Sequence, residues 1–332
     1  MTSCLIVIPC LNEEAFLPGL LQQLRADGPD HLIVVADGGS TDASRAIVES
    51  LARRDPNVRL LDNPHRIQSA GVNLALRSFG AGRRWFVRVD AHCKYPDGYV
   101  SGLLETAESM SVVSVVVPMV TASTTCFQSA VATAQNSVLG TGGSAHRHLG
   151  RGRFVDHGHH ALMSVEAFAT AGGYNEAMSH NEDAELDQRL QKLGKIWLEP
   201  RHAITYFPRR TPIALARQYF GYGKGRAQTL KMHRMRPRVR QMVPVMVPMA
   251  VALALLAPLS PVFALPILGW ASIALGAGLA LGLAQRSRCA IMSGPAAMLM
   301  HLAWGCGFLK GTVSQLPTAR LSPVSASTHP RI

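Results

Sequence analysis

The sequence predicts an α/β protein whose mostly parallel sheet is covered by helices on both faces and is followed by C-terminal transmembrane helices. Short apolar segments alternate with helical patterns through the first hundred of its 332 residues, an order typical of parallel sheets. All 21 Asp and Glu residues lie at or before Glu199. Residues 242–284 then carry no charge, a longer run than one membrane span of about 20 residues needs.

The individual elements follow from the spacing of apolar side chains. Residues 5–8 (Leu-Ile-Val-Ile) are a continuous apolar run of the kind that forms a buried strand. Leu17, Leu20, Leu21 and Leu24 follow with the spacing of one helical face. By the same patterns we expect strands at residues 5–8, 32–36, 58–61, 85–89 and 112–117, and helices around residues 17–24, 46–51, 67–77 and 182–193.

Charge divides the chain into two parts. Residues 1–199 contain 17 Lys and Arg against 21 acidic residues, whereas the remainder contains 16 Lys and Arg and no acidic residue. A basic segment beside apolar segments indicates contact with anionic membrane lipids. The basic stretch abuts apolar spans and lacks a nucleic-acid-binding motif, so nucleic acid is not an expected partner. With 48% hydrophobic residues, the composition also excludes intrinsic disorder.

The location of the chain is predicted from its ends and its basic flanks. The N-terminus has no basic region before its short apolar run, so it is interpreted as a strand and not as a signal peptide. The positive-inside rule places the basic residues of 224–240 and 286–288 in the cytoplasm. We therefore expect a multi-pass protein of the cytoplasmic membrane with its first domain in the cytoplasm. The six cysteines form no CxxC pair, and we expect free thiols.

Polar residues that end the predicted strands are the first candidates for a site, because ligands bind beyond the carboxyl ends of parallel strands. Asp37-Gly-Gly-Ser-Thr-Asp42 joins a strand to a helix, and is either a ligand-binding turn or an ordinary capped turn. Asp90 and His92 end another strand one residue apart, so their side chains point the same way and could share a divalent cation. Asp-x-His also occurs by chance.

A third candidate opens the helix predicted from residue 182. Leu186, Leu190 and Leu193 form its expected buried stripe, and Asp183 lies on that stripe, pointing toward a cleft. Such a carboxylate suits a general base that accepts a proton from a hydroxyl. Glu182 and Glu185 are explained by the helix dipole alone. The segment 156–160 (Asp-His-Gly-His-His) could line an acceptor pocket, bind metal or form a self-satisfied polar loop.

Taken together, the motifs resemble those of the family 2 glycosyltransferases with the GT-A fold, over roughly residues 3–230. The order is Ile8-Pro-Cys-Leu-Asn-Glu-Glu14, Asp37–Asp42, Val89-Asp-Ala-His92, Gly172-Gly-Tyr-Asn-Glu176 and Asn181-Glu-Asp183. The details are most similar to the membrane-anchored, ExoA-like branch of succinoglycan biosynthesis: the Asp-Ala-His motif, the segment 63–73 and the sequence Arg217-Gln-Tyr-Phe-Gly-Tyr-Gly223.

The resemblance implies roles for individual residues. Asp90, with His92, would hold Mg²⁺ or Mn²⁺ at the diphosphate of a nucleotide-sugar, and Asp183 would be the base of an inverting single displacement. Such a cation neutralises a diphosphate as it leaves the sugar. The donor itself would be held by Pro9, Asn12, Glu13, Asp37, Asp42, Arg66, Ser69 and Asp90.

The resemblance also implies an organisation and a reaction. We expect a GT-A catalytic domain at 1–208, a basic and aromatic membrane-interface segment at 209–241, about three transmembrane helices within 242–310 and a flexible tail at 311–332. The expected activity transfers a hexose, with UDP as the preferred nucleotide, to a polyprenyl-diphosphate-linked glycan in exopolysaccharide biosynthesis. The alternatives are a polyprenyl-phosphate glycosyltransferase similar to dolichyl-phosphate mannose synthases, or a non-catalytic nucleotide-binding membrane scaffold.

The sequence departs from the family pattern in two places. His92 stands where the commonest motif has a second Asp, which affects how strongly the site binds metal. The Gln-x-x-Arg-Trp signature of processive synthases is absent, and Arg217-Gln218 with Lys224 and Arg226 lies in its expected place. We therefore expect one sugar to be transferred per event.

Overall fold

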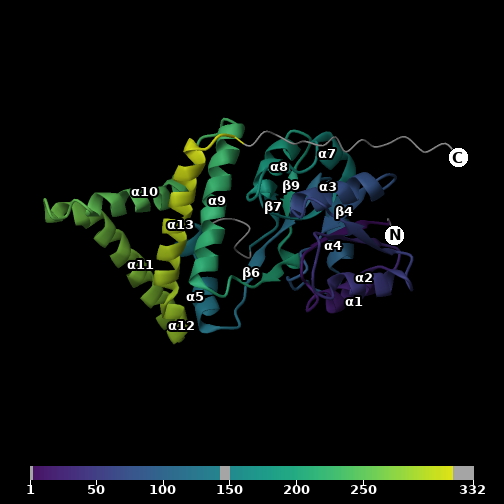
Figure 1. Ribbon diagram of the computed structural model, residues 1–332, viewed down its shortest axis with the longest axis horizontal. Coiled ribbons are helices and arrows are strands. Elements are labelled where there is room, and N and C mark those ends of the chain that lie inside the picture. The colour runs from purple at the N-terminus through teal and green to yellow at the C-terminus, as the bar shows by residue number, and fades with distance from the viewer. Residues whose placement is uncertain (1–2, 143–149, 317–332) are drawn as a thin grey trace.

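The computed structural model describes residues 3–142 and 150–316 and is built around a single large twisted sheet (Figure 1). In the described residues this sheet has eight strands in the order β3-β2-β1-β4-β8-β5-β9-β7. The strands are β1 (Leu5–Cys10), β2 (Leu32–Asp37), β3 (Val58–Asp62), β4 (Trp85–Arg88), β5 (Ser114–Val117), β7 (Arg153–Val155), β8 (His159–Ser164) and β9 (Ile196–Leu198).

The first four strands are parallel, as the alternation of apolar and helical segments predicted. β1 pairs in parallel with both β2 and β4, so Cys10 lies beside Asp37 at the carboxyl edge of the sheet. β8 is inserted antiparallel between β4 and β5. A separate pair, β6 (Met119–Thr121) and β10 (Ile204–Tyr206), lies between this sheet and the C-terminal helices.

Helices cover both faces of the sheet, which confirms the predicted layering. One core cluster joins the strands to α1, α2 and α4, and the other joins them to α3, α7 and α8. The expected stripe on α8 is confirmed at Leu186 and Leu190, but Leu193 lies beyond the helix and is 42% exposed. The helices are α1 (Leu17–Asp27), α2 (Ser44–Ala52), α3 (Gln68–Phe79), α4 (Tyr99–Met110), α7 (Val165–Thr170) and α8 (Glu182–Leu190).

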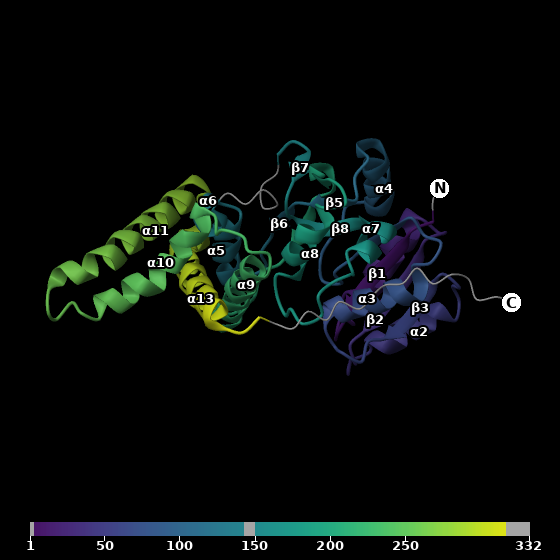
Figure 2. The ribbon, with the colours of Figure 1, turned by 90° about the horizontal axis from the view of Figure 1, so that it is seen from above.

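The C-terminal half is helical and packs around one long helix, α9. Its backbone approaches α13 closely, because a Cβ on Gly223 would lie 2.0 Å from the carbonyl oxygen of Trp304. Figures 1 and 2 show α9 and α13 side by side, with α5 against them. The elements are α5 (Cys126–Gln135), α6 (Val138–Thr141), α9 (Pro212–Met232), α10 (Val239–Ala254), α11 (Leu265–Ala284), α12 (Arg288–Ile291) and α13 (Ser293–Val313).

Helices α10 and α11 form a hairpin that projects away from the rest of the molecule (Figures 1 and 2). Within the described residues, two helical stretches are long and apolar enough to cross a membrane, Pro261–Ala284 and Arg288–Val313. α10 is shorter and contains Pro244 and Pro248. The predicted third apolar segment therefore exists as α13, and most of the predicted tail, residues 317–332, lies outside the described residues.

The expectation of free thiols is wrong for two of the six cysteines. Cys126 at the start of α5 and Cys289 in α12 form a disulfide, with their Cα atoms 5.1 Å apart. They are 163 residues apart in the chain, so their spacing in the sequence carried no sign of the pairing. Helix packing brings them together, and the bond ties α5 to the segment that follows the apolar hairpin.

Candidate active site

A cavity of about 1240 Å³ opens at the carboxyl edge of the sheet and extends to the C-terminal helices. The residues that line it include Pro9 near the end of β1, Ala36 and Gly38 around the end of β2, and Asp90 just beyond β4. This is where parallel strands of an open sheet place their ligands. Pro9, Glu13, Arg66, Asp90, His92 and Asp183, all predicted as site residues, line this one cavity.

Asp37 is buried at the end of β2, with its carboxylate turned toward its own turn. It accepts hydrogen bonds from the backbone N–H groups of Gly39 (3.1 Å) and Ser40 (3.2 Å), and pairs with Arg45 at 2.8 Å. Burial would raise the pKa of Asp37, but the hydrogen bonds from Ser40 and Arg45 outweigh it and lower the pKa. Asp37 is therefore an ionised residue that shapes the glycine turn beside the cavity.

Asn12 and Asp42 lock two neighbouring loops to each other. The Asn12 Oδ1 atom accepts from the Thr41 N–H (2.8 Å), and the Asp42 Oδ2 atom accepts from the Glu14 N–H (3.0 Å). Asn12 adopts a left-handed backbone conformation, φ 57°, which asparagine tolerates better than most residues. In this structure both side chains fix the loops that carry the cavity wall, so their predicted contact with the donor stays a prediction.

Arg66 and Ser69 have different surroundings although both were predicted to hold the donor. Arg66 is exposed, lines the cavity and lies over the glycine turn, with its Nε 3.5 Å from the position a Cβ on Gly39 would take. Ser69 is buried in the first turn of α3. The wall beside it is formed by Ile67 and Gln68, so Arg66 is the better placed of the two for a diphosphate.

The predicted metal ligand Asp90 has a carboxylate that lies at the cavity and is 19% exposed. His159 Nε2 lies 3.6 Å and Arg88 Nε 3.7 Å from its carboxylate oxygens. The Arg88 guanidinium thus places positive charge near Asp90. This donor set fits Mg²⁺ or Mn²⁺, which commonly take one or two protein carboxylates and complete the shell with substrate phosphates and water.

His92, the second predicted ligand, is oriented by a carboxylate. Its Nδ1 atom lies 3.0 Å from Glu13 Oε1. When Nδ1–H donates to a carboxylate, the other ring nitrogen remains available to a cation, as in many metal-binding histidines. The hydrogen bond that Glu13 accepts is also the main cause that raises the pKa of His92. Glu13 therefore orients the second predicted ligand, in addition to its predicted place near the donor.

Asp183 lies at the head of α8 and points inward, as predicted. Its Oδ1 atom is 2.6 Å from Arg88 Nη1, its Oδ2 atom is 3.2 Å from Arg88 Nη2, and Oδ1 also accepts from the Tyr174 hydroxyl at 2.9 Å. Burial opposes the charge on Arg88, yet the Asp183 carboxylate and Tyr174 raise the pKa of Arg88 well above its usual value. A fully charged guanidinium thus holds the Asp183 carboxylate in place.

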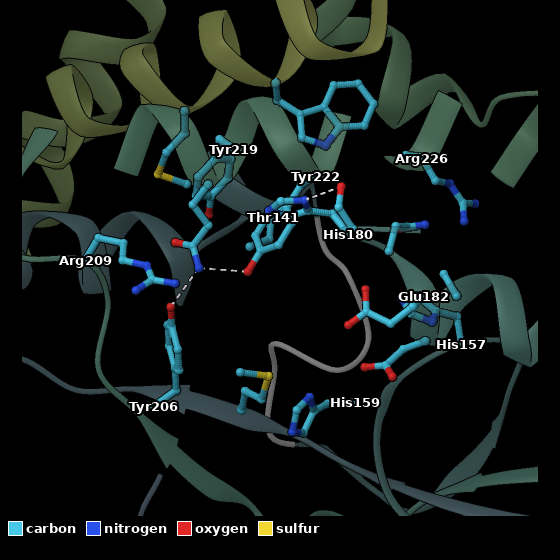
Figure 3. Close-up of a pocket in the computed structure, with 18 of the residues that line it drawn as sticks. Thr141, His157, His159, His180, Glu182, Tyr206, Arg209, Tyr219, Tyr222 and Arg226 are labelled. Carbon is cyan, nitrogen blue, oxygen red and sulfur yellow. Dashed lines mark hydrogen bonds between the residues drawn. The ribbon is translucent and has the colours of Figure 1, made fainter. Parts of the chain in front are cut away.

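Glu182, the neighbour of Asp183, also lines the cavity, although the sequence predicted only a helix-dipole role for it. Burial, and then the adjacent Asp183 charge, raise the pKa of Glu182 to about 7. A carboxyl group with this pKa changes its charge near neutral pH. Glu182 is therefore a second proton-handling group next to the predicted base (Figure 3).

The segment at 156–159 lines the cavity, which was one of the predicted alternatives. His157 Nδ1 lies 2.8 Å from Asp187 Oδ2, and Asp187 is fully buried. His159 approaches Asp90, and Asp156 pairs with Arg238. Among the described residues no group of three or more His, Cys, Asp and Glu could by itself hold a metal. The side chain of His160 lies outside the described residues.

The far end of the cavity is built from the C-terminal helices. Tyr219 of α9, Pro244 of α10, Ile273 of α11 and Trp304 of α13 line it. Figure 3 shows Tyr206 and Arg209 on one side of the cavity and Arg226, Glu182 and His157 on the other. The cavity therefore extends from the sheet edge to an end where apolar side chains of the C-terminal helices form part of its wall.

Sequence reasoning missed Arg88 and Tyr174 as parts of the site, and it named His157 only within the segment 156–160, without its partner Asp187. Arg88 could have been found, because it lies two residues before Asp90 and so shares its face of the chain. Tyr174 belongs to the Gly172–Glu176 motif, but its hydrogen bond to Asp183 depends on how two loops meet. His157 depends on the buried Asp187, 30 residues further along the chain.

Comparison with known proteins gives a consistent result. Residues 5–172 match the model of glycosyl transferase family 2. The chain is 48% identical over 310 residues to the succinoglycan biosynthesis protein ExoA of Rhizobium meliloti (strain 1021), covering 92% of this chain and 94% of that protein. Among solved structures, the mannosyltransferase PcManGT from Pyrobaculum calidifontis, in complex with GDP-Man and Mn²⁺, is similar with a TM-score of 0.58 and 16% identity, covering 90% of this chain and 85% of that one. At 16% identity, this last match shows a similar fold and nothing more.

Proposed function

Because this chain belongs to glycosyl transferase family 2 and is a glycosyltransferase of exopolysaccharide biosynthesis, we propose that it is a metal-dependent, inverting enzyme. Its donor is a nucleotide-diphosphate hexose, with UDP as the expected nucleotide. Its acceptor is a glycan linked to polyprenyl diphosphate. The observation that carries the proposal is that Arg88 bridges Asp90 and Asp183 at one cavity, from 3.7 Å to the first and 2.6 Å to the second.

The binding site of the nucleotide-sugar donor is assigned to the carboxyl edge of the sheet. Asp90 and His92 would hold the cation, and Arg66 would contact the diphosphate beside the glycine turn. The bound cation supplies positive charge that stabilises the diphosphate as it leaves. Pro9, Asn12, Asp37 and Asp42 would form or fix the part of the wall that holds the nucleoside, and Ser69 would support it from within α3.

The group that accepts the proton of the acceptor hydroxyl is assigned to the start of α8. A single displacement needs a base on the face of the sugar opposite the leaving group, and no covalent nucleophile. We assign this role to Asp183, whose carboxylate Arg88 holds in place through two hydrogen bonds. A carboxylate has about four acceptor sites, so Asp183 can accept a hydrogen bond from the acceptor hydroxyl beside those from Arg88 and Tyr174. Glu182 is the competing candidate, because its pKa of about 7 lies near the operating range of a base.

The apolar hairpin is assigned to the membrane. α10 and α11 expose large apolar side chains over most of their length, and Arg286 and Arg288 follow the end of α11. We propose that this hairpin enters the cytoplasmic membrane with the catalytic domain on the cytoplasmic side. α13 packs mainly along α9 and also contacts α10 and α11 (Figure 1). It is itself long and apolar enough to cross a membrane, and we assign it to the third predicted span.

The acceptor could instead be a polyprenyl monophosphate, which was the alternative from the sequence. The 48% identity to a succinoglycan biosynthesis protein favours the oligosaccharide acceptor. The scaffold alternative is set aside, because family membership and this identity support an enzyme.

The test is a donor panel with the full chain in detergent. Nucleotide-sugars are supplied with Mn²⁺ or Mg²⁺, and release of nucleoside diphosphate is measured with lipid-linked acceptors. We expect turnover that requires both the cation and a lipid diphosphate glycan. A radiolabelled product carrying one sugar on a monophosphate lipid would contradict the proposed acceptor, and no turnover with any donor would contradict the proposed reaction.

A further inference from the structure

Three arginines at the hairpin end of the cavity form a cluster that the donor assignment does not use. Arg226 comes from α9, and Arg238 and Arg240 stand at the start of α10; all three line the cavity. We call these three residues the arginine cluster. Arg238 is paired with Asp156. Burial is the main cause that lowers the pKa of Arg226. The positive charges of Arg238 and Arg240 lower it further.

The arginine cluster is short of partners for its charge. The Nε atom of Arg226 is buried and has no hydrogen-bond partner among the residues that the structure describes. A buried guanidinium N–H without a hydrogen bond is costly, and a second guanidinium nearby adds repulsion. An anion with several oxygens removes both costs, because the planar guanidinium forks onto phosphate oxygens in pairs.

The position of the cluster suggests which anion it binds. On one side of it the cavity wall is apolar, formed by Val243 and Pro244 of α10 and by Ile273 of α11. Figure 3 shows Arg226 on the same side of the cavity as Glu182, the neighbour of the proposed base. A ligand that fits this order has an apolar chain, then an anionic group, then a hydroxyl. The cation site at Asp90 and His92, by contrast, lies at the sheet edge.

We propose that Arg226, Arg238 and Arg240 bind the diphosphate of the lipid-linked acceptor, with its polyprenyl chain along α10 and α11 and its sugar directed toward the head of α8. This inference rests on the proposed function. It assigns two separate diphosphate sites to one cavity, one for the donor at the sheet and one for the acceptor at the hairpin. Asp156 pairs with Arg238, one member of the acceptor site.

The proposal is tested by binding, with the full chain in detergent and farnesyl diphosphate as the probe. Farnesol carries only the isoprenoid chain and inorganic pyrophosphate only the anion, so the two compounds measure the contribution of each part to binding. The variants are Arg226→Gln and Arg240→Gln, which leave the Asp156 pair intact. Arg236→Gln is the matched control. Arg236 is exposed, and its substitution removes the same charge from the same segment. UDP with Mn²⁺ reports on the donor site and on correct folding.

We expect each cavity variant to weaken farnesyl diphosphate binding about tenfold, as the loss of a charge-assisted pair does, with UDP binding and the Arg236→Gln control unchanged. Unchanged farnesyl diphosphate binding would overturn the proposal. A parallel loss of UDP binding would also overturn the proposal, because it would assign the arginine cluster to the donor. If the variants lost binding to phosphatidylglycerol vesicles alone, the arginine cluster would be a membrane anchor, and the proposal would be overturned as well. The absence of any sugar transfer by the unmodified chain would contradict the proposed function, which the binding result does not measure.

Discussion

Arg88 and Asp183 form a two-point ion pair at the base of the cavity, although 95 residues separate them in the chain. The Arg88 side chain is 2% exposed and that of Asp183 is 18% exposed, so the pair lies between the core and the cavity. It joins the end of β4, two residues before the proposed metal ligand Asp90, to the helix that carries the proposed base. The pair therefore links the two parts of the proposed site.

Replacing Arg88 with Lys should lower both activity and stability. A lysine supplies charge but not the planar fork that meets both Asp183 oxygens, and breaking a buried pair costs about 3–5 kcal/mol. We expect a lower unfolding midpoint and a large loss of kcat, measured by thermal denaturation and sugar transfer. Tyr174→Phe, which removes one hydrogen bond from Asp183, is the milder comparison, at about 1 kcal/mol. Equal stability and activity in Arg88→Lys would contradict the linking role.

Activity should rise with pH through about 7 because of Glu182. Its carboxyl group is neutral below its pKa of about 7 and charged above it, and the added charge beside Asp183 makes that carboxylate a stronger base. The folded chain binds this proton more tightly than the unfolded chain, where the pKa is about 4.5, so the contribution of Glu182 to stability falls as the pH rises between these values.

The variant Glu182→Gln tests this pH dependence. It should flatten the limb of the kcat profile near pH 7 and leave transfer measurable on both sides of it. A limb that persists unchanged in Glu182→Gln would show that another group titrates there. If Glu182→Gln abolished transfer and Asp183→Asn did not, Glu182 would be the base.

A close contact couples α9 to the loop before the base. A Cβ on Gly225 would lie 2.4 Å from the carbonyl oxygen of His180, so Gly225→Ala must displace the turn that leads into α8. Small misplacements of catalytic groups can cost up to about 100-fold in rate, and we expect a fall of that order in kcat with donor binding retained. Gly19→Ala is the control, because nothing lies within 4 Å of its Cβ. Full activity of Gly225→Ala would exclude this coupling.

The fold was largely predictable because its signals are local. The apolar runs that became β1 to β4 and the leucine spacing of α1 are read from neighbouring residues, as are the polar ends at Asp37 and Asp90. The Arg88–Asp183 pair and the Cys126–Cys289 bond join residues 95 and 163 positions apart. Their partners are set by packing between elements, and a single sequence carries no record of that packing.

The direction of a side chain was predictable only where a regular element fixes it. Asp183 points inward because it lies on the helical stripe of Leu186 and Leu190. Asp37 ends a regular strand, but its carboxylate turns to Arg45 because the glycine turn offers it backbone N–H groups. The three carboxylates therefore differ in the structure: Asp90 and Asp183 face the cavity, and Asp37 shapes its edge.

Removal of the divalent cation should affect donor binding through Asp90. Chelation with EDTA is expected to weaken UDP binding and abolish transfer in the unmodified chain, since the cation offsets the charge of the diphosphate. Asp90→Asn should bind UDP weakly at any Mn²⁺ concentration, as measured by calorimetry. Cation-independent binding and turnover in both proteins would contradict the metal assignment.

The most direct test compares Asp183→Asn with the unmodified chain in a single assay of UDP binding and sugar transfer. Asparagine keeps the shape of the side chain but cannot accept the proton, and loss of a general base costs about a thousandfold in rate. We expect UDP to bind Asp183→Asn in the presence of Mn²⁺ as it binds the unmodified chain, with transfer reduced by about that factor. Transfer at the unmodified rate would show that the carboxylate held by Arg88 does not take the acceptor's proton.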